Sequence, residues 1–318
     1  MSGLRLATLA DLRAPASSSG GKRAVARALA ELEARPDEAG SQALLDEAWA
    51  CGEGRAVGLT GPPGVGKSTL TGALVAGLRA AGSRVAVAAV DPSSRASGGA
   101  ILGDRTRIEA DPADAGVFVR SFAARDRLGG LSEAAVPAVT LFRALYDVVL
   151  VETVGAGQSE TDVADLVDLV LLCVQPGSGD ALQFMKAGVM EIPDLAVVTK
   201  SDLGQVAARA AADLGAALAL AVREGEPPQV LSVSAKTGDG LDALVGTLLE
   251  RLQRAGGAGL ARRREAQARA WLRQALTARF GREGWAALGD HARLRPGESP
   301  FARERAAAGL LRARLAAK

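Results

Sequence analysis

The sequence predicts an α/β fold in which a mostly parallel central sheet is covered by helices. The first reason is that short apolar segments alternate with helical ones from Arg55 to about residue 240. The second is that segments such as LVLLCV (169–174) are apolar at every position rather than at every other one. Strands that are apolar on both sides are typical of a parallel sheet between two helix layers.

The elements follow one another in a regular order. KRAVARALAELEAR (22–35) and SQALLDEAWA (41–50) have apolar residues on one face, which predicts an N-terminal helical extension over residues 1–52. Residues 53–255 form the sheet domain, with strands expected at AVGLT, RVAVAAVD, VFVRSF, DVVLVET, DLVLLCVQ, LAVVTKSD and QVLSVSAK. Helices are expected there at STLTGALVAGLRAAG and PAVTLFRALY. Residues 256–318 form a C-terminal helical region with an apolar stripe of Trp271, Leu272, Leu276 and Phe280.

Composition argues against several classes of protein. The net charge of the 318 residues is only +2, so the chain lacks the basic excess of many nucleic-acid-binding domains. One histidine and two distant cysteines, Cys51 and Cys173, argue against a dedicated transition-metal site and a disulfide framework. No apolar run reaches the roughly 18 residues of a membrane span, and the charged N-terminus is unlike a secretory signal. We therefore expect a cytoplasmic protein that does not bind membranes.

The clearest motif is GPPGVGKST (61–69), which lies between a predicted strand and a predicted helix. It matches the phosphate-binding pattern G-x-x-x-x-G-K-[ST] in full. The expected nucleotide-binding residues are Gly61, Pro62, Pro63, Gly64, Val65, Gly66, Lys67, Ser68 and Thr69. Backbone N–H groups of such a loop bind phosphate oxygens. Lys67 is expected to reach the β- and γ-phosphates, and Ser68 to ligate Mg²⁺.

TKSD (199–202) follows an apolar strand and resembles the Asn-Lys-x-Asp motif with which GTPases select guanine. By this resemblance Asp202 accepts hydrogen bonds from guanine N1–H and the 2-amino group, and the stem of Lys200 packs along the base. Thr199 replaces the usual asparagine, and a hydroxyl cannot reproduce both amide functions. VSAK (233–236) resembles the loop that contacts the guanine oxygen, with Ser234, Ala235 and Lys236. The order of these motifs predicts a P-loop GTPase that binds GTP and GDP.

Carboxylates at strand ends complete the predicted site. Glu152 stands where GTPases have the aspartate of D-x-x-G, so we expect it to hold Mg²⁺ through water and Gly155 to contact the γ-phosphate. Asp91 ends another strand, and Asp104 lies in the glycine-rich segment that follows. Either aspartate can orient the attacking water or a Mg²⁺-bound water, and the residues alone do not decide between them. With Lys67, these three acids are the expected catalytic residues.

Four longer segments resemble those of one family: GPPGVGKST, AVDPSSRASGGAILGDRTR, LVETVGAGQSE and QPGSGDALQFMKAG. This is the family of methylmalonyl-CoA mutase-associated GTPases, called the MeaB type in bacteria and the MMAA type in human mitochondria. The same family has been labelled ArgK, a transport-system kinase. The resemblance runs from about Lys22 to the C-terminus.

The resemblance implies a chaperone that gates cofactor loading into an adenosylcobalamin-dependent acyl-CoA mutase and protects or reactivates that enzyme. It also implies a homodimer joined through the C-terminal helices. The stripe from Trp271 to Phe280 fits a dimer, although it can also pack on its own chain. QPGSGDALQFMKAG resembles a switch segment that signals the nucleotide state to the mutase. The expected switch and partner residues are Gln158, Gly177, Gly179, Asp180 and Lys186.

Three other functions remain open. A nickel-inserting metallochaperone GTPase shares the sheet and the order of motifs, but it normally carries a His- or Cys-rich segment. The older family name implies a protein kinase that acts on a transport component. ARRREAQAR suggests nucleic-acid binding, although a solvated helix face explains its arginines better.

Overall fold

The computed structural model of the chain describes residues 7–13, 19–92, 111, 113–124, 134–153, 162–177, 191–221 and 226–316. Contacts divide the chain into two units. The first, here called the sheet unit, comprises Gly54–Ala135 and Tyr146–Ala255. The second, here called the helical unit, comprises Met1–Glu53, Val136–Leu145 and Gly256–Lys318. None of the helices in the described ranges is both long enough and apolar enough to cross a membrane.

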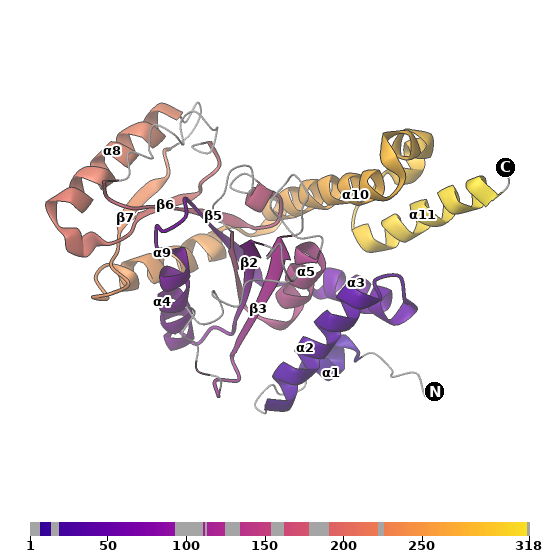
Figure 1. The fold of residues 1–318 in the computed structure, drawn as a ribbon, viewed down its shortest axis with the longest axis horizontal. Helices are drawn as coiled ribbons and strands as arrows, with labels where there is room; N and C mark the ends of the chain where they lie inside the picture. The colour runs from indigo at the N-terminus through magenta and orange to yellow at the C-terminus, as the bar shows by residue number, and fades with distance from the viewer. Residues whose placement is uncertain are drawn as a thin grey trace. The chain divides into compact units, whose positions relative to one another are not determined.

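The sheet unit contains a seven-stranded sheet in the order β3-β2-β4-β1-β5-β6-β7 (Figure 1). The strands are β1 (Arg55–Thr60), β2 (Val85–Pro92), β3 (Val117–Ala124), β4 (Val148–Glu152), β5 (Leu169–Val174), β6 (Leu195–Val198) and β7 (Gln229–Ser232). Every neighbouring pair is parallel. The prediction of a parallel α/β sheet is therefore confirmed.

Different helices cover the two faces of the sheet. On one face α4 (Lys67–Ala80) and α9 (Leu241–Arg254) pack over side chains that include Leu171 and Val197. On the other face α8 (Gln205–Ala221) packs over Leu172 and Val198. Because neighbouring side chains of a strand point to opposite faces, the continuous apolar runs supply both cores.

The edge strand β7 differs from the expectation of a strand buried on both faces. Its four residues, QVLS, are exposed or half-buried. An edge strand has a neighbour on one side only, so its polar ends Gln229 and Ser232 remain in contact with water.

The parallel register brings the carboxyl ends of five strands to one edge of the sheet. Leu59 of β1 pairs with Glu152 of β4, and Thr60 pairs with Leu172 of β5. Further along, β5, β6 and β7 end in line at Val174, Val198 and Ser232. Loops that follow these strands therefore start side by side, as is usual for ligand sites of α/β sheets.

The helical unit combines elements from both ends of the chain. Its helices are α1 (Leu9–Arg13), α2 (Ser19–Ala34), α3 (Ala39–Cys51), nearly all of α5 (Ala135–Leu145), α10 (Gly257–Leu288) and α11 (Pro300–Ala316). The α10 segment contains a break at Gly281, whose φ of 74° and ψ of 176° are not helical. The N-terminal and C-terminal regions, which the sequence separates, thus lie in one unit.

The apolar stripe of α10 is covered within the helical unit itself. Leu272 and Leu276 are 1% and 0% exposed, and they pack with residues of α11 such as Leu311. The ring of Trp271 meets the ring of Phe301 at 4.7 Å between centroids. The stripe that we expected to fit a dimer interface therefore has a cover in its own chain.

Ion pairs join the helix hairpin α2–α3 to the C-terminal helices inside this unit. Arg279 of α10 pairs with Asp37 at 2.6 Å and with Glu304 at 3.0 Å. Asp46 of α3 accepts a hydrogen bond from Ser299 at 2.5 Å and pairs with Arg305. The Arg279 guanidinium holds the pKa of Asp37 below its usual value.

Replacing Gly61 by alanine is expected to destabilise the sheet unit by about 2–3 kcal/mol. Its φ is +139°, and an added Cβ would lie 2.2 Å from the carbonyl oxygen of Cys173. Gly64→Ala is the matched control, because φ there is +76° but nothing lies within 4 Å of the added Cβ. The control should cost about 1 kcal/mol. Equal losses in urea unfolding of the two variants would contradict this interpretation.

Candidate functional site

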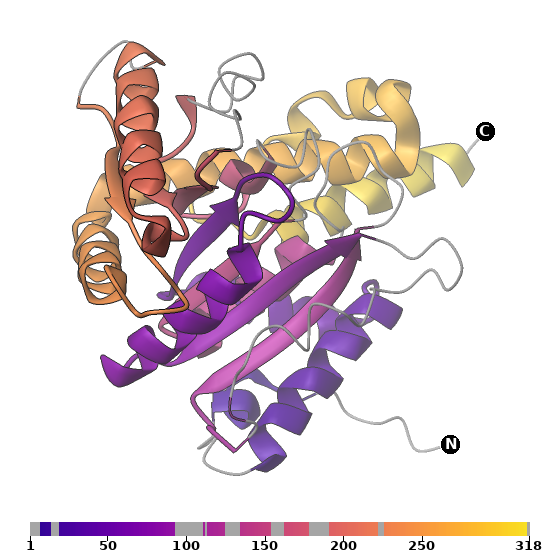
Figure 2. The ribbon, with the colours of Figure 1, turned by 60° about the vertical axis from the view of Figure 1, so that its left-hand side comes forward.

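The phosphate-loop sequence forms a tight turn between β1 and α4. Gly61, Gly64 and Gly66 have φ values of 139°, 76° and 96°, a region that favours glycine. Gly66 is the N-cap of α4, which begins at Lys67. Figure 2 shows the chain curling from the tip of β1 into the start of α4. The N–H groups at such a helix start can bind an anion.

Lys67 lies against the backbone of this loop. Its side chain is buried, with 6% of the residue exposed. The ammonium group donates hydrogen bonds to the carbonyl oxygens of Gly61 at 2.7 Å and Pro62 at 3.0 Å. The loop therefore contains a fixed positive charge next to its backbone donors, which is suited to a phosphate.

Glu152, at the end of β4, meets the first turn of α4. One carboxylate oxygen accepts a hydrogen bond from the Ser68 hydroxyl at 2.6 Å, and the other accepts one from the Thr71 hydroxyl at 3.2 Å. Glu152 is 5% exposed and Thr71 is fully buried. A carboxylate and a hydroxyl at this spacing are hard oxygen donors, the kind that Mg²⁺ prefers.

Thr199 connects the end of β6 to the phosphate loop. Its hydroxyl donates to the carbonyl oxygen of Val65 at 2.7 Å, and its backbone N–H donates to Val174 at 2.8 Å. Thr199 is 5% exposed, so these bonds form away from water. Although threonine cannot reproduce both amide functions of asparagine, its hydroxyl makes a contact to the loop backbone.

Lys200 makes a second connection of the same kind. Its ammonium group donates to the side-chain oxygen of Gln175 at 2.5 Å and lies 3.4 Å from the carbonyl oxygen of Gly64. Its φ is 56°, and no other non-glycine residue in the described ranges has a positive φ. Two successive residues of TKSD therefore reach two successive carbonyls of the phosphate loop.

These carbonyl contacts orient the N–H groups of the loop. A peptide unit is planar and trans, so its C=O and N–H point in opposite directions. Fixing the carbonyl of Val65 fixes the N–H of Gly66, and fixing that of Gly64 orients the N–H of Val65. Pro62 and Pro63 carry no N–H, so the loop has fewer donors than one without prolines, and these two are among those that remain.

Asp202 and the SAK turn lie together beyond Lys200. Ser234 donates its hydroxyl to Asp202 at 2.7 Å, and the Ser234 oxygen accepts the N–H of Thr237 at 3.2 Å. The pKa of Asp202 is lowered, mainly by the Ser234 hydrogen bond and also by the charges of Lys236 and Lys200. The carboxylate is exposed and ionised at neutral pH, and it can accept hydrogen bonds from a base. Ala235 and Lys236 lie in the turn that follows.

Several predicted residues cannot be placed. Asp104, Gly155, Gln158, Gly179, Asp180 and Lys186 lie outside the described residues. Asp91 lies in β2 opposite Ala123, but its side chain is outside the described part of the structure. Gly177 is described, exposed, and has a φ of 77°. Thr69 is exposed on α4.

Sequence reasoning missed two residues that contact the site. Thr71 lies three positions after Ser68, so both hydroxyls share one face of α4 and reach the same carboxylate. That spacing could have identified it. Gln175 directly follows β5, and only the pairing of β5 with β6 brings it to Lys200. No short motif signals such a contact.

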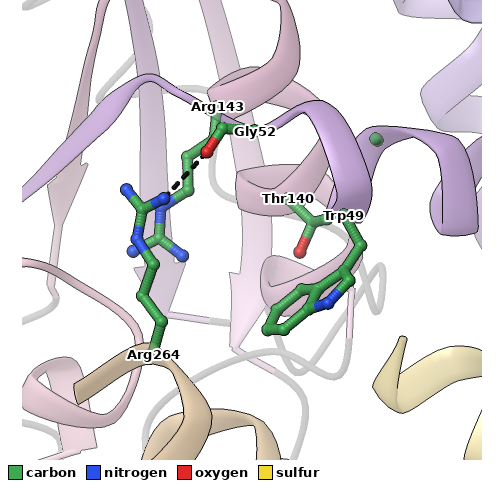
Figure 3. Close-up of a pocket in the computed structure, with 6 residues that line it drawn as sticks. Trp49, Gly52, Thr140, Arg143 and Arg264 are labelled. Atoms are coloured by element: carbon green, nitrogen blue, oxygen red, sulfur yellow. Dashed lines mark hydrogen bonds between the residues drawn. The ribbon is translucent and has the colours of Figure 1, made fainter. Parts of the chain in front are cut away.

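The helical unit contains a separate small cavity of about 50 Å³. Its lining consists of Ala48, Trp49, Gly52, Thr140, Arg143 and Arg264. Figure 3 shows the guanidinium groups of Arg143 and Arg264 close together, with Arg264 donating to the Gly52 carbonyl at 2.8 Å. Gly52 follows the last residue of α3, where the helix dipole favours cations.

Comparison with known proteins shows the family of the chain. The family model described as methylmalonyl Co-A mutase-associated GTPase MeaB matches residues 24–291. A Mycobacterium tuberculosis protein named a probable GTPase is 43% identical over 268 residues, which cover 81% of this chain and 80% of that protein. The methylmalonic aciduria type A homolog of Mus musculus, a mitochondrial protein, is 40% identical over 222 residues, covering 68% of this chain and 54% of its own.

A solved structure matches nearly the whole length of the chain. The crystal structure described as an LAO/AO transport system kinase has 30% sequence identity and a TM-score of 0.64. The match covers 98% of this chain and 100% of the other. The family model, the relatives and the P-loop sheet agree, and the chain belongs to the MeaB family of methylmalonyl-CoA mutase-associated GTPases.

Proposed function

We propose that this GTPase is a chaperone of an adenosylcobalamin-dependent acyl-CoA mutase, and that its nucleotide state gates cofactor loading and protects or reactivates the mutase. The observation that carries the proposal is the match of the mutase-associated family model to residues 24–291. The mouse relative is named for methylmalonic aciduria, and that name also supports a connection to methylmalonyl-CoA mutase. The transport-system kinase is supported by the name of one structural relative, and neither it nor the nickel metallochaperone is better supported than the mutase chaperone.

The proposed nucleotide site lies at the carboxyl edge of the sheet. The N–H groups of the non-proline residues of 61–69 and the Lys67 ammonium hold the phosphates, and Gly155 contacts the γ-phosphate. Asp202 reads guanine N1–H and the 2-amino group, the Lys200 stem lies along the base, and the Ser234–Lys236 turn faces the guanine oxygen. The contacts that Thr199 and Lys200 make to the loop support one continuous site.

Mg²⁺ fits the proposed site, because Ser68 and Glu152 offer hard oxygens 2.6 Å apart. Bound there, the ion would neutralise charge on the β- and γ-phosphates. Ser68 would be a direct ligand, and Glu152 would act through water. Thr71 holds the second carboxylate oxygen and so fixes the direction of Glu152. Asp91 or Asp104 is proposed to orient the attacking water.

The proposed signal to the mutase passes through the segment that follows β5. Gly177, Gly179, Asp180 and Lys186, together with Gln158, are the proposed switch and partner residues. Loops that γ-phosphate and Mg²⁺ order are released on hydrolysis. We also propose a cytoplasmic homodimer joined through the C-terminal helices. Family resemblance supports the dimer, whereas the stripe on α10 is already covered.

Thr199→Val should weaken binding of GTP and GDP by about 5- to 10-fold, because the Val65 carbonyl loses its hydrogen bond and the N–H of Gly66 loses its fixed direction. Thr199→Ser retains the hydroxyl and should stay within about 2-fold of the natural protein. Calorimetric titration measures both. If the serine variant binds the nucleotides as weakly as the valine variant, the hydroxyl hydrogen bond to Val65 does not determine nucleotide affinity.

Glu152→Gln should reduce the Mg²⁺ affinity of the GTP complex by about 10- to 100-fold. An amide is neutral, and its NH₂ group cannot accept the hydrogen bond that one of the two carboxylate oxygens accepts from Ser68 or Thr71. Binding of GTP in EDTA should change little. Asp213→Asn, at an exposed position on α8, is the control. Unchanged Mg²⁺ dependence of GTP binding in the glutamine variant would remove Glu152 from the metal site.

The chaperone proposal is tested by capture of partners on the tagged full chain from the source organism, once with GDP and once with a non-hydrolysable GTP analogue. An adenosylcobalamin-dependent acyl-CoA mutase should bind, in amounts that differ between the two nucleotides. Lys67→Ala should abolish that difference, because it removes the ammonium of the phosphate loop. Failure of any such mutase to bind in either state would reject the chaperone role and leave the GTPase assignment intact.

A further inference from the structure

We propose that Gln175 is a positioning residue for nucleotide binding, which acts by holding the Lys200 side chain in place beside the base. The amide oxygen of Gln175 lies 2.5 Å from the Lys200 ammonium. The only other acceptor described for that ammonium, the carbonyl of Gly64, is 3.4 Å away, near the limit of a hydrogen bond. Gln175 is therefore the stronger of the two anchors.

The position of Gln175 follows from the parallel pairing of β5 and β6. Val174 pairs with Val198, and the Val174 carbonyl accepts the N–H of Thr199. Gln175, one residue after β5, and Lys200, two residues after β6, are therefore held near each other by the ladder. A side chain at 175 with an oxygen at the right distance can meet the lysine without any change in the backbone.

Lys200 has reason to need an anchor. Its backbone takes the left-handed conformation, with a φ of 56°, which is unfavourable for a residue with a Cβ. Unfavourable backbone conformations of this kind occur at functional sites, where they direct a side chain toward a ligand. The side chain is exposed, and a free lysine loses rotamer entropy whenever a ligand orders it. An anchor that orders it beforehand lowers the entropy lost on binding.

The same anchor affects the phosphate loop. The Lys200 ammonium bridges the Gln175 amide and the Gly64 carbonyl. The Gly64 carbonyl and the N–H of Val65 belong to one planar peptide unit, so the bridge also favours one direction for a loop donor. Gln175 thus supports both the base half and the phosphate half of the proposed nucleotide site.

The test uses the full chain and two diphosphates, GDP and IDP. IDP lacks the 2-amino group that Asp202 is proposed to bind, but it retains the face along which the lysine stem lies. Gln175→Met keeps the length of the side chain and removes the acceptor, whereas Gln175→Glu retains an acceptor oxygen. Gln229→Met is the matched control. Gln229 is exposed and lies at the start of β7, the end opposite to the carboxyl edge of the sheet.

Gln175→Met should raise the Kd of GDP and of IDP by the same factor, about 3- to 10-fold, which is the range for freeing one long side chain. Gln175→Glu should restore binding to within about 2-fold, and Gln229→Met should have no effect. On a Lys200→Met background, Gln175→Met should cause no further loss, because its effect acts through the lysine. Melting temperatures should show that all variants are folded.

This inference rests on the proposed role of Lys200. The Lys200→Met variant and the double variant together distinguish a failure of that role from a failure of the role of Gln175. If Lys200→Met binds GDP normally, the lysine is not at the base, and both the site assignment and the inference are wrong. If Lys200→Met weakens binding but Gln175→Met does not, only the role of Gln175 is rejected. An additive loss in the double variant, or no recovery with glutamate, likewise rejects it.

Discussion

The hydrogen bond from the Thr199 hydroxyl to the Val65 carbonyl is the interaction on which the arrangement of the site depends. It joins the loop after β1 to the end of β6, two segments 134 positions apart in the sequence. Because a peptide unit is planar, this one bond also directs the N–H of Gly66. The two prolines of the loop offer no N–H, so the direction of each remaining donor matters more than in a loop without them.

Parallel pairing makes this contact possible. Every neighbouring pair of strands runs in the same direction, so the phosphate loop, Glu152 and the TKSD segment all begin at one edge of the sheet. The helix start at Lys67 contributes its positive end there, and Glu152 provides the balancing negative charge. Burial of that carboxylate is tolerated because both of its oxygens accept hydrogen bonds from hydroxyls of α4.

The sequence was sufficient for the fold and the main motifs. Continuous apolar runs such as LVLLCV predicted strands covered on both faces. GPPGVGKST predicted the phosphate loop, because that loop requires glycine and lysine at fixed positions. The burial of β7 was predicted less well than that of the other strands, because an edge strand does not need to be buried on both faces. The cover over the stripe of Trp271 could not be foreseen, because it depends on how α10 and α11 pack.

Contacts between distant segments were also beyond the sequence. Gln175 looked like the first residue of a switch segment, and nothing in QPGSGD indicates that its side chain meets Lys200. Thr199 was recognised as a departure from asparagine, but which carbonyl it would bind depended on the register of β5 and β6. Local motifs therefore predict the residues of the candidate site, and strand pairing decides which of them touch.

The most direct test is calorimetric titration of the full chain with GTP and with ATP under the same conditions, in the presence of Mg²⁺. The Asp202 carboxylate, held by Ser234, can accept from the N1–H and 2-amino group of guanine but finds neither in adenine. We expect GTP to bind at least about 100-fold more tightly than ATP. Equal affinity for the two nucleotides would contradict it, because the TKSD and SAK segments would then not read the base.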